Sequence, residues 1–174
     1  LAVASNGMIY VTAGGAEGWL FKLKPNGKLD DRVRVGHTPL SPVISADGKT
    51  IYVLNRFDNT VSFVNADRMK VTTTIRVTRE PFAAALGAGG KLLFVANHLP
   101  CSKATDDVVA AAVNVIDVTT QKAVKNVILP NGSTGVRGCG ASPDGKYIYV
   151  THTFGRYQLP TTQLERGWMN TAGL

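Results

Sequence analysis

The residues best suited to chemistry are arginine, histidine and asparagine side chains that follow short apolar segments of the chain. A cluster of Arg with His would suit an anionic group, because a guanidinium forms bidentate contacts with carboxylate or phosphate. The simpler alternative is that these side chains solvate loops or satisfy loop carbonyls. The candidate ligand-binding residues are His37, Arg79, Glu80, Asn97, His98, Arg137, His152, Arg156, Gln158, Arg166 and Trp168, and Asn55, Arg56 and Asp58 lie in the same kind of loop.

Two of the histidines raise the question of a metal or haem ligand. His98 and His152 follow similar apolar segments and could both face one pocket, where imidazole would be a suitable ligand. The sequence has no HxxxH, HExxH or CxxCH motif, however. A histidine that hydrogen-bonds a neighbouring loop is the simpler interpretation, so we predict no metal site.

Catalytic groups with a recognisable spacing are not found in the sequence. There is no nucleophile beside an activating base, no carboxylate pair and no phosphate loop, since the run 87–91 leads into Leu92 instead of Ser or Thr. Glu80 beside Arg79 is most simply an ion pair. We therefore predict no catalytic residue and no bound cofactor, and a non-catalytic role is favoured over an enzymatic one.

The two cysteines, Cys101 and Cys139, lie in an expanded loop and at the beginning of a later apolar segment. In an exported protein a disulfide could hold the expanded loop in place. Two separate buried thiols are an equally good interpretation, and the sequence leaves both open.

An internal repeat positions these residues. The segment Ile-Tyr-Val at 9–11 recurs at 51–53, and similar segments follow at 93–95 and 148–150. Residues 19–23 align with 61–65 and 113–117, and residues 33–35 align with 75–77 and 127–129. Fixed self-similarity of this kind is typical of repeat architectures.

Turn signals divide each repeat into four short strands. Asp-Gly-Lys at 47–49 and 144–146 and Gly-Gly-Lys at 89–91 each precede an apolar segment, and such pairs adopt the positive φ that tight hairpins need. In the second repeat the expected strands are 41–46, 50–54, 60–65 and 70–77.

Repeats of this length and strand number predict an all-β fold, a β-propeller of four-stranded antiparallel blades. The expected blades lie near 1–38, 39–80, 81–135 and 136–174. A β-sandwich with accidental spacing is the alternative. Because propellers close with about four to eight blades, we expect a partial propeller of three blades and part of a fourth, completed by further chain or by other copies.

The irregular segments of the repeat fall on one rim of such a fold. In an antiparallel blade, the loop from the second to the third strand and the link to the next blade emerge on the same side. That rim would carry the insertion between Asn97 and Val113, the longer link at 130–136 and the unpatterned stretch after Val150. Insertions on one face of a rigid scaffold often carry binding groups, so we expect the candidate residues to converge between the third and fourth blades.

The amino-acid sequences of the repeats at 142–151 (SPDGKYIYVT) and 113–120 (VNVIDVTT) resemble the YVTN family of β-propeller repeats. The likeness covers about the first 150 residues and is weaker at Asn6-Gly7-Met8 and at 87–90, where the usual turn is replaced. It implies a bacterial or archaeal exported protein of the periplasm or cell surface, sometimes fused to cytochrome c modules. The segment 151–170 is similar to one in cell-surface YVTN proteins with cytochrome partners, and redox-enzyme propellers such as the amine dehydrogenase heavy chain are also similar.

Charge and hydropathy limit the function further. The net charge of +7 would allow an acidic partner, but Lys and Arg are spread along the chain, so we predict no nucleic-acid binding. There is no apolar run long enough for a membrane span. The leading hypothesis is a surface or periplasmic scaffold that binds a protein or glycan through the insertion-rich rim. The alternatives are the propeller part of a periplasmic redox enzyme completed by a haem domain elsewhere, or a purely structural array.

Overall fold

The computed structural model describes residues 1–155 and 170–174, which form four antiparallel sheets. Apart from a short 3-10 turn at Ala88–Gly90, the described elements are strands. The first sheet holds β1 (Ala2–Val3), β2 (Ile9–Ala13), β3 (Gly18–Leu23) and β4 (Leu29–Val35). The second holds β5 (Pro39–Ile44), β6 (Thr50–Asn55), β7 (Thr60–Asn65) and β8 (Lys70–Arg76).

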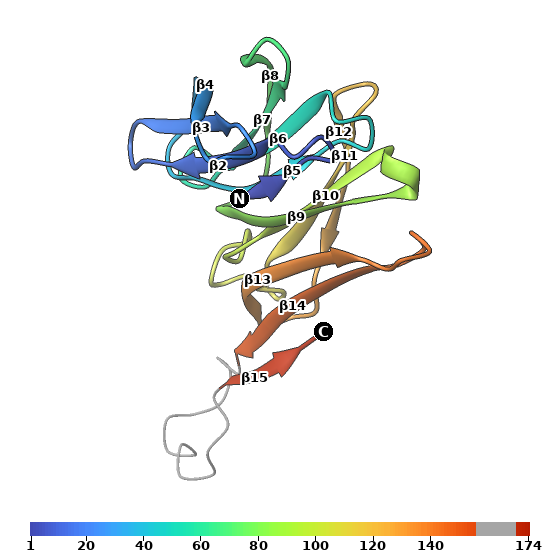
Figure 1. Ribbon diagram of the computed structural model, residues 1–174. Coiled ribbons are helices and arrows are strands. Elements are labelled where there is room, and N and C mark those ends of the chain that lie inside the picture. The colour runs from blue at the N-terminus through green and yellow to red at the C-terminus, as the bar shows by residue number, and fades with distance from the viewer. Residues whose placement is uncertain (156–169) are drawn as a thin grey trace.

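The third sheet contains β9 (Pro81–Gly87), β10 (Leu92–Asn97), β11 (Ala112–Asp117) and β12 (Lys122–Ile128). The fourth contains β13 (Ser133–Ala141), β14 (Ile148–Gly155) and β15 (Asn170–Gly173). The sheets follow one another in an open arc, with the first and the fourth at its two ends (Figure 1). The predicted all-β partial propeller is confirmed, and we call the sheets the first to fourth blades.

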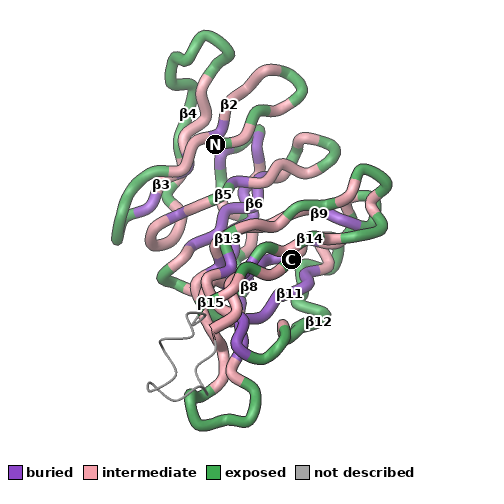
Figure 2. The backbone as a smooth tube through the Cα atoms, turned by 90° about the horizontal axis from the view of Figure 1, so that it is seen from below, coloured by how far each residue is buried: buried purple, intermediate pink, exposed green. Residues whose placement is uncertain are grey.

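The core lies in the gaps between blades. Leu20, Ile51, Val53 and Val64 fill the gap between the first and second blades, hereafter the first gap, and are fully buried. The second gap, between the second and third blades, is filled by Leu54, Val61, Phe63, Leu93, Val95 and Ile116. Figure 2 shows the buried backbone in the middle strands, such as β6 and β11, and exposed backbone in many of the turns. Each sheet therefore depends on its neighbour for burial, as expected of a blade.

One part of the repeat alignment is wrong by one residue. Tyr52 pairs with Phe63 across β6 and β7, whereas Tyr10 pairs with Lys22 across β2 and β3. The loop before β3 is one residue longer, so Lys22 and not Phe21 occupies the position of Phe63. Because a one-residue slip turns every side chain of a strand to the other face, Phe21 lies on the face of the first blade that points away from the second.

The hairpin turns at Ser45 and Ser142 are built in the same way. In the first of them the Ser45 hydroxyl donates to Asp47 Oδ1 at 2.6 Å and accepts from the Thr50 backbone N–H at 2.9 Å. The Lys49 N–H also donates to Asp47 Oδ1. Ser142 and Asp144 repeat these bonds at the same distances of 2.6 and 2.9 Å. The Ser-x-Asp-Gly-Lys motif of the sequence thus forms a turn that is stabilised by hydrogen bonds of its own Ser and Asp side chains.

Among the described residues, no helix has the length and apolar character that crossing a membrane requires.

Candidate functional site

The rim that carries the inter-blade links is held together by backbone hydrogen bonds, and we call it the linker rim. The Arg56 N–H donates to the Thr38 carbonyl, and the His98 N–H donates to the Glu80 carbonyl. Thr38 and Glu80 both have positive φ, at 48° and 50°, a conformation that is uncommon outside glycine. The two links therefore follow the same path into β5 and β9 and fix the neighbouring loops.

Asn97 acts as an internal anchor of this rim. Its side chain is fully buried, and its amide nitrogen donates to the Ala112 carbonyl and to Asn114 Oδ1 at 2.8 and 2.9 Å. Its oxygen accepts from the Arg79 N–H at 3.3 Å. With these bonds made inside the protein, Asn97 holds the link in place and has no surface to offer a ligand.

Glu80 pairs with an arginine from the preceding blade. Nε and Nη2 of Arg56 lie 3.1 and 2.8 Å from Glu80 Oε2, and both side chains are partly buried. The guanidinium of Arg79 instead donates to the Pro100 carbonyl at 3.1 Å, and so ties down the expanded loop. The predicted ion pair between Arg79 and Glu80 is therefore wrong, because the loop that carries Arg56 brings a better-placed partner.

Planar side chains cross the linker rim in a row. His37 contacts Phe57 edge-on at 5.2 Å, and the Arg56 guanidinium lies 4.9 Å from the Phe57 ring and 5.5 Å from the Phe82 ring. Phe82 in turn stacks on His98 at 5.1 Å. We call these five residues the rim row. Phe57 is half exposed at 50 %, so an aromatic surface flanked by an imidazole and a guanidinium faces solvent.

The two histidines at the third and fourth blades have different surroundings. His98 lies in the rim row, with Nδ1 3.1 Å from the Val136 carbonyl, as a loop-bonded histidine would. His152 belongs to β14 and is 8 % exposed, with its ring 4.5 Å from that of Phe154. Its Nδ1 has no hydrogen-bond partner among the described residues.

A cavity of about 340 Å³ lies beside His152, between the third and fourth blades. Its lining is mostly apolar and comes from Phe94, Val113, Val127 and Leu129 on one side and Ile148, Val150 and Phe154 on the other. His98 does not line it. The two histidines therefore do not share this cavity, and the described residues contain no group of three or more His, Cys, Asp or Glu that could hold a metal ion.

Both cysteines are free thiols, so the disulfide that the sequence allowed is not formed. Cys139 Sγ contacts the Phe94 carbonyl in the middle of β10, whereas Cys101 Sγ contacts the Ala110 carbonyl within its own loop. The two thiols therefore contact different parts of the third blade. Burial raises the pKa of Cys139 to about 11, which leaves it a poor nucleophile at neutral pH.

The remaining predicted residues are less informative. Arg137 is exposed on β13. Arg156, Gln158, Arg166 and Trp168 lie outside the described residues, so the expected convergence at the fourth blade rests on residues without a described position.

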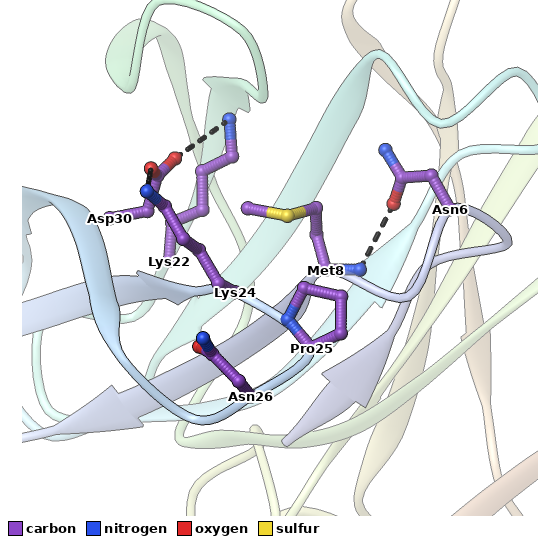
Figure 3. A pocket seen from close by; sticks show the side chains of 7 residues that line it. All are labelled: Asn6, Met8, Lys22, Lys24, Pro25, Asn26 and Asp30. Atoms are coloured by element: carbon purple, nitrogen blue, oxygen red, sulfur yellow. Dashed lines mark hydrogen bonds and ion pairs between the residues drawn. The ribbon is translucent and has the colours of Figure 1, made fainter.

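Two hollows are not marked by any motif of the sequence. One lies on the first blade at the opposite rim, where the hairpin turns lie, and is lined by Asn6, Met8, Lys22, Lys24, Pro25, Asn26 and Asp30 (Figure 3). The Asp30 carboxylate in this hollow lies 3.7 Å from the Lys22 ammonium and 3.6 Å from that of Lys24. The other, of about 320 Å³, opens at the linker rim and includes Asn55 and Asp58.

Comparisons with known proteins support the fold class and no further identity. No family model matches the chain, and no curated protein sequence matches it. The structure is similar to hydrazine synthase of Kuenenia stuttgartiensis, with a TM-score of 0.51 and 19 % identity over 98 % of this chain and 63 % of that one. It is also similar to the dihydro-heme d1 dehydrogenase NirN in complex with DHE, with a TM-score of 0.67 and 16 % identity over 87 % of this chain and 31 % of that one.

The chain thus has the β-propeller fold, and it spans less than two thirds of the length of either protein. Identities of this size establish a shared fold and leave the activity open.

Proposed function

We propose that this chain is the binding part of an exported β-propeller that holds a protein or glycan on its linker rim without chemical turnover. The observation that carries the proposal is the rim row, in which the half-exposed ring of Phe57 is flanked by His37 and Arg56. Aromatic and arginine side chains dominate the energetics of recognition surfaces. The resemblance to YVTN repeats supports a periplasmic or cell-surface location.

The rigidity of the rim supports the same conclusion. The Gly36 N–H donates to Asn55 Oδ1 at 2.9 Å, and the His37 N–H donates to Asp58 Oδ2 at 2.7 Å. The Glu80 N–H is held in the same manner by Asn59. A surface whose loops are ordered before binding loses little conformational entropy when a partner arrives.

The experiment compares the wild type with Phe57→Ala on an array of neutral and acidic oligosaccharides and of acidic and basic proteins. Tyr147→Ala is the matched control, because Tyr147 is an exposed aromatic residue, at 62 %, outside the rim row. We expect the wild type and Tyr147→Ala to retain the same partner, and Phe57→Ala to bind it at least about tenfold more weakly. Equal binding by all three proteins, or conversion of the partner into product, would contradict the proposal.

A second function is favoured by the names of the two similar structures, a hydrazine synthase and a dehydrogenase that acts on a heme d1 compound. In that case the chain would be the propeller part of a redox enzyme. The haem would then be supplied by another domain or by a cytochrome c partner.

The full-length protein separates the two functions. A redox enzyme requires CxxCH motifs or another haem-binding domain in the flanking sequence, together with visible absorbance of the purified protein. A protein that retains its partner, carries no visible chromophore and has no such domain is a binding scaffold.

A further inference from the structure

The cavity in the first gap at the linker rim is lined mainly by polar side chains. It has a volume of about 320 Å³, at the lower end of the range of small-molecule sites. The polar lining comes from a carboxylate, an amide and three hydroxyls, which belong to Asp58, Asn55, Thr60, Ser62 and Thr74. Such a mixture raises the question of why the protein leaves this space unfilled.

The same position in the second gap is filled by side chains. Asn114 Oδ1 accepts from the Thr78 N–H, the Thr78 hydroxyl and the Asn97 amide nitrogen, each at 2.9 Å. The Asn114 amide nitrogen donates to Asn126 Oδ1 at 3.3 Å. Three amides and a hydroxyl thus close the gap with a connected hydrogen-bond network.

Strand register identifies the residues that stand in their place in the first gap. Ser62 pairs with Thr74 across β7 and β8, as Asn114 pairs with Asn126 across β11 and β12. Gly36 follows Val35 as Thr78 follows Val77. The first gap therefore has Gly, Ser and Thr where the second has Thr, Asn and Asn, and the missing atoms leave the cavity.

The link is nevertheless held as firmly in the first gap as in the second. Asn114 and Asn97 receive the N–H groups of Thr78 and Arg79 in the second gap. In the first gap Asn55 and Asp58 receive those of Gly36 and His37.

Gly36 is required by this rearrangement. A Cβ atom at Gly36 would lie 2.3 Å from Asp58 Oδ2 and 2.6 Å from Asn55 Cγ. The cavity is thus built into the fold and is not a packing defect, because the backbone hydrogen bonds are kept while the space stays open.

We propose that this cavity binds one neutral hexose unit of a glycan. The Asp58 carboxylate disfavours an anion and can accept a hydrogen bond from a neutral hydroxyl. The hydroxyls of Ser62 and Thr74 add groups that both donate and accept. Val35 and Val71 supply an apolar surface for the C–H groups of a sugar ring. The inference rests on the proposed function and deepens it by naming the ligand class.

Arg34 also borders the cavity, but its side chain is directed elsewhere. Arg34 pairs with Trp19 across β3 and β4, on the face of the first blade that points away from the second, and its guanidinium lies 3.1 Å from Glu17. The charge within the cavity is therefore that of Asp58.

The test titrates the chain with the methyl glycosides of glucose, galactose and mannose, followed by saturation-transfer difference NMR and calorimetry. Glucuronate serves as an anionic analogue of similar size. We expect saturable binding of one neutral glycoside with a dissociation constant on the order of 1 mM. Glucuronate should bind at least about tenfold more weakly, since its carboxylate meets Asp58 in the cavity.

Two substitutions locate the site. Thr74→Trp fills the cavity from an exposed position, and Ser62→Asn with Thr74→Asn copies the second gap. Both should weaken binding at least about tenfold, a difference of about 1.4 kcal/mol. Lys70→Trp, an exposed residue of the same strand that does not line the cavity, should bind as the wild type does. Because Ser62 is buried, Thr74→Trp keeps the test valid if the double variant does not fold.

Three results would overturn the inference: no saturation by any neutral glycoside, tighter binding of glucuronate, or unchanged binding by Thr74→Trp. The outcome remains separable from that of the proposed function. A partner on the array that is lost with Phe57→Ala but kept with Thr74→Trp, without any saturable sugar, leaves the binding scaffold intact and rejects the hexose site. A chain that binds neither an array partner nor a glycoside contradicts both.

Discussion

The first and second gaps have the same architecture but differ at both of their ends. In the middle each gap is closed by fully buried aliphatic side chains, such as Leu20 and Ile51 in the first and Val95 and Ile116 in the second. At the turn rim the second gap holds the Tyr52–Phe63 pair, with ring centroids 4.8 Å apart. The first gap has Lys22 at the position of Phe63, and Lys22 borders the hollow on the first blade (Figure 3).

The difference shows which part of a blade interface determines the fold. Burial of the middle side chains is common to both gaps and is the main favourable contribution to stacking. The ends tolerate a lysine for a phenylalanine, or a glycine for a threonine, without loss of the backbone hydrogen bonds of the links. Binding groups can therefore be placed at the ends of a gap with little effect on the stack.

The largest expected effect comes from the paired positions Phe63 and Lys22. Phe63→Ala removes a ring that is 1 % exposed and should lower the free energy of unfolding by about 3–5 kcal/mol. Lys22→Ala should cost about 1 kcal/mol or less, since it removes a partly exposed ion pair and a hydrogen bond to the Ala66 carbonyl. Chemical denaturation of both variants measures the two values. Equal losses would mean that the two gaps are packed alike.

The next effect concerns the amide network at the linker rim. Asn114→Ala leaves the Thr78 N–H and the Asn97 amide without their acceptor in a closed space, and should cost roughly 2–4 kcal/mol. Ser62→Ala in the first gap should cost about 1 kcal/mol, because the Asn55 amide keeps its bond to Thr60. Unfolding midpoints at constant m-value provide the comparison. A larger loss for Ser62→Ala would show that the first gap is the less tolerant one.

The fold could be predicted from the sequence because turn residues and apolar segments recur along the chain. In the second blade the expected strands at 50–54 and 60–65 are close to β6 and β7, and the inner strand differs by two residues at each end. The error at β3 arose from a loop one residue longer, a change that identity of residue type does not reveal. Phe21 and Phe63 are alike in sequence but lie on opposite faces of their sheets.

The site was harder to predict, because a polar residue on a rim can bind a ligand, form an ion pair or anchor the backbone. Asn97 and Glu80 were selected for their polarity, yet Asn97 is a buried anchor and Glu80 pairs with Arg56. The partners depend on how loops of different length meet, which no spacing rule contains. The cavity did leave a signal: Ser62 and Asn114 occupy equivalent positions, and comparing the repeats by side-chain volume would have pointed to it.

At Gly36 and Thr78 the order is reversed, because here the substitution in the first gap should cost more stability than the one in the second gap. Gly36→Ala places a Cβ against Asp58 and Asn55 and should cost roughly 1–3 kcal/mol. Thr78→Ala removes a hydroxyl bond but keeps the backbone N–H bonded to Asn114, so about 0.5–1.5 kcal/mol is expected. Thermal unfolding of both variants tests the order. If Gly36→Ala were as stable as the wild type, Asp58 and Asn55 would have to be less firmly placed than the structure indicates.

The smallest expected effect concerns the turn carboxylates Asp47 and Asp144, whose contributions to stability should depend on pH in the same way. The pKa of Asp47 is lowered mainly by the hydrogen bond from the Ser45 hydroxyl, and that of Asp144 by the bond from the Ser142 hydroxyl. A lowered pKa in the folded state means that the ionised carboxylate adds stability above about pH 4. This contribution is lost as the pH falls through the folded pKa. Asp47→Asn and Asp144→Asn should therefore each lower the unfolding midpoint slightly at pH 7 and match the wild type near pH 2. Because both turns are exposed and use the same bonds, the unfolding midpoints of the two variants should depend on pH in the same way. Different pH dependences would show that the blade in which a turn lies, and not only its own side chains, determines the stability of the turn.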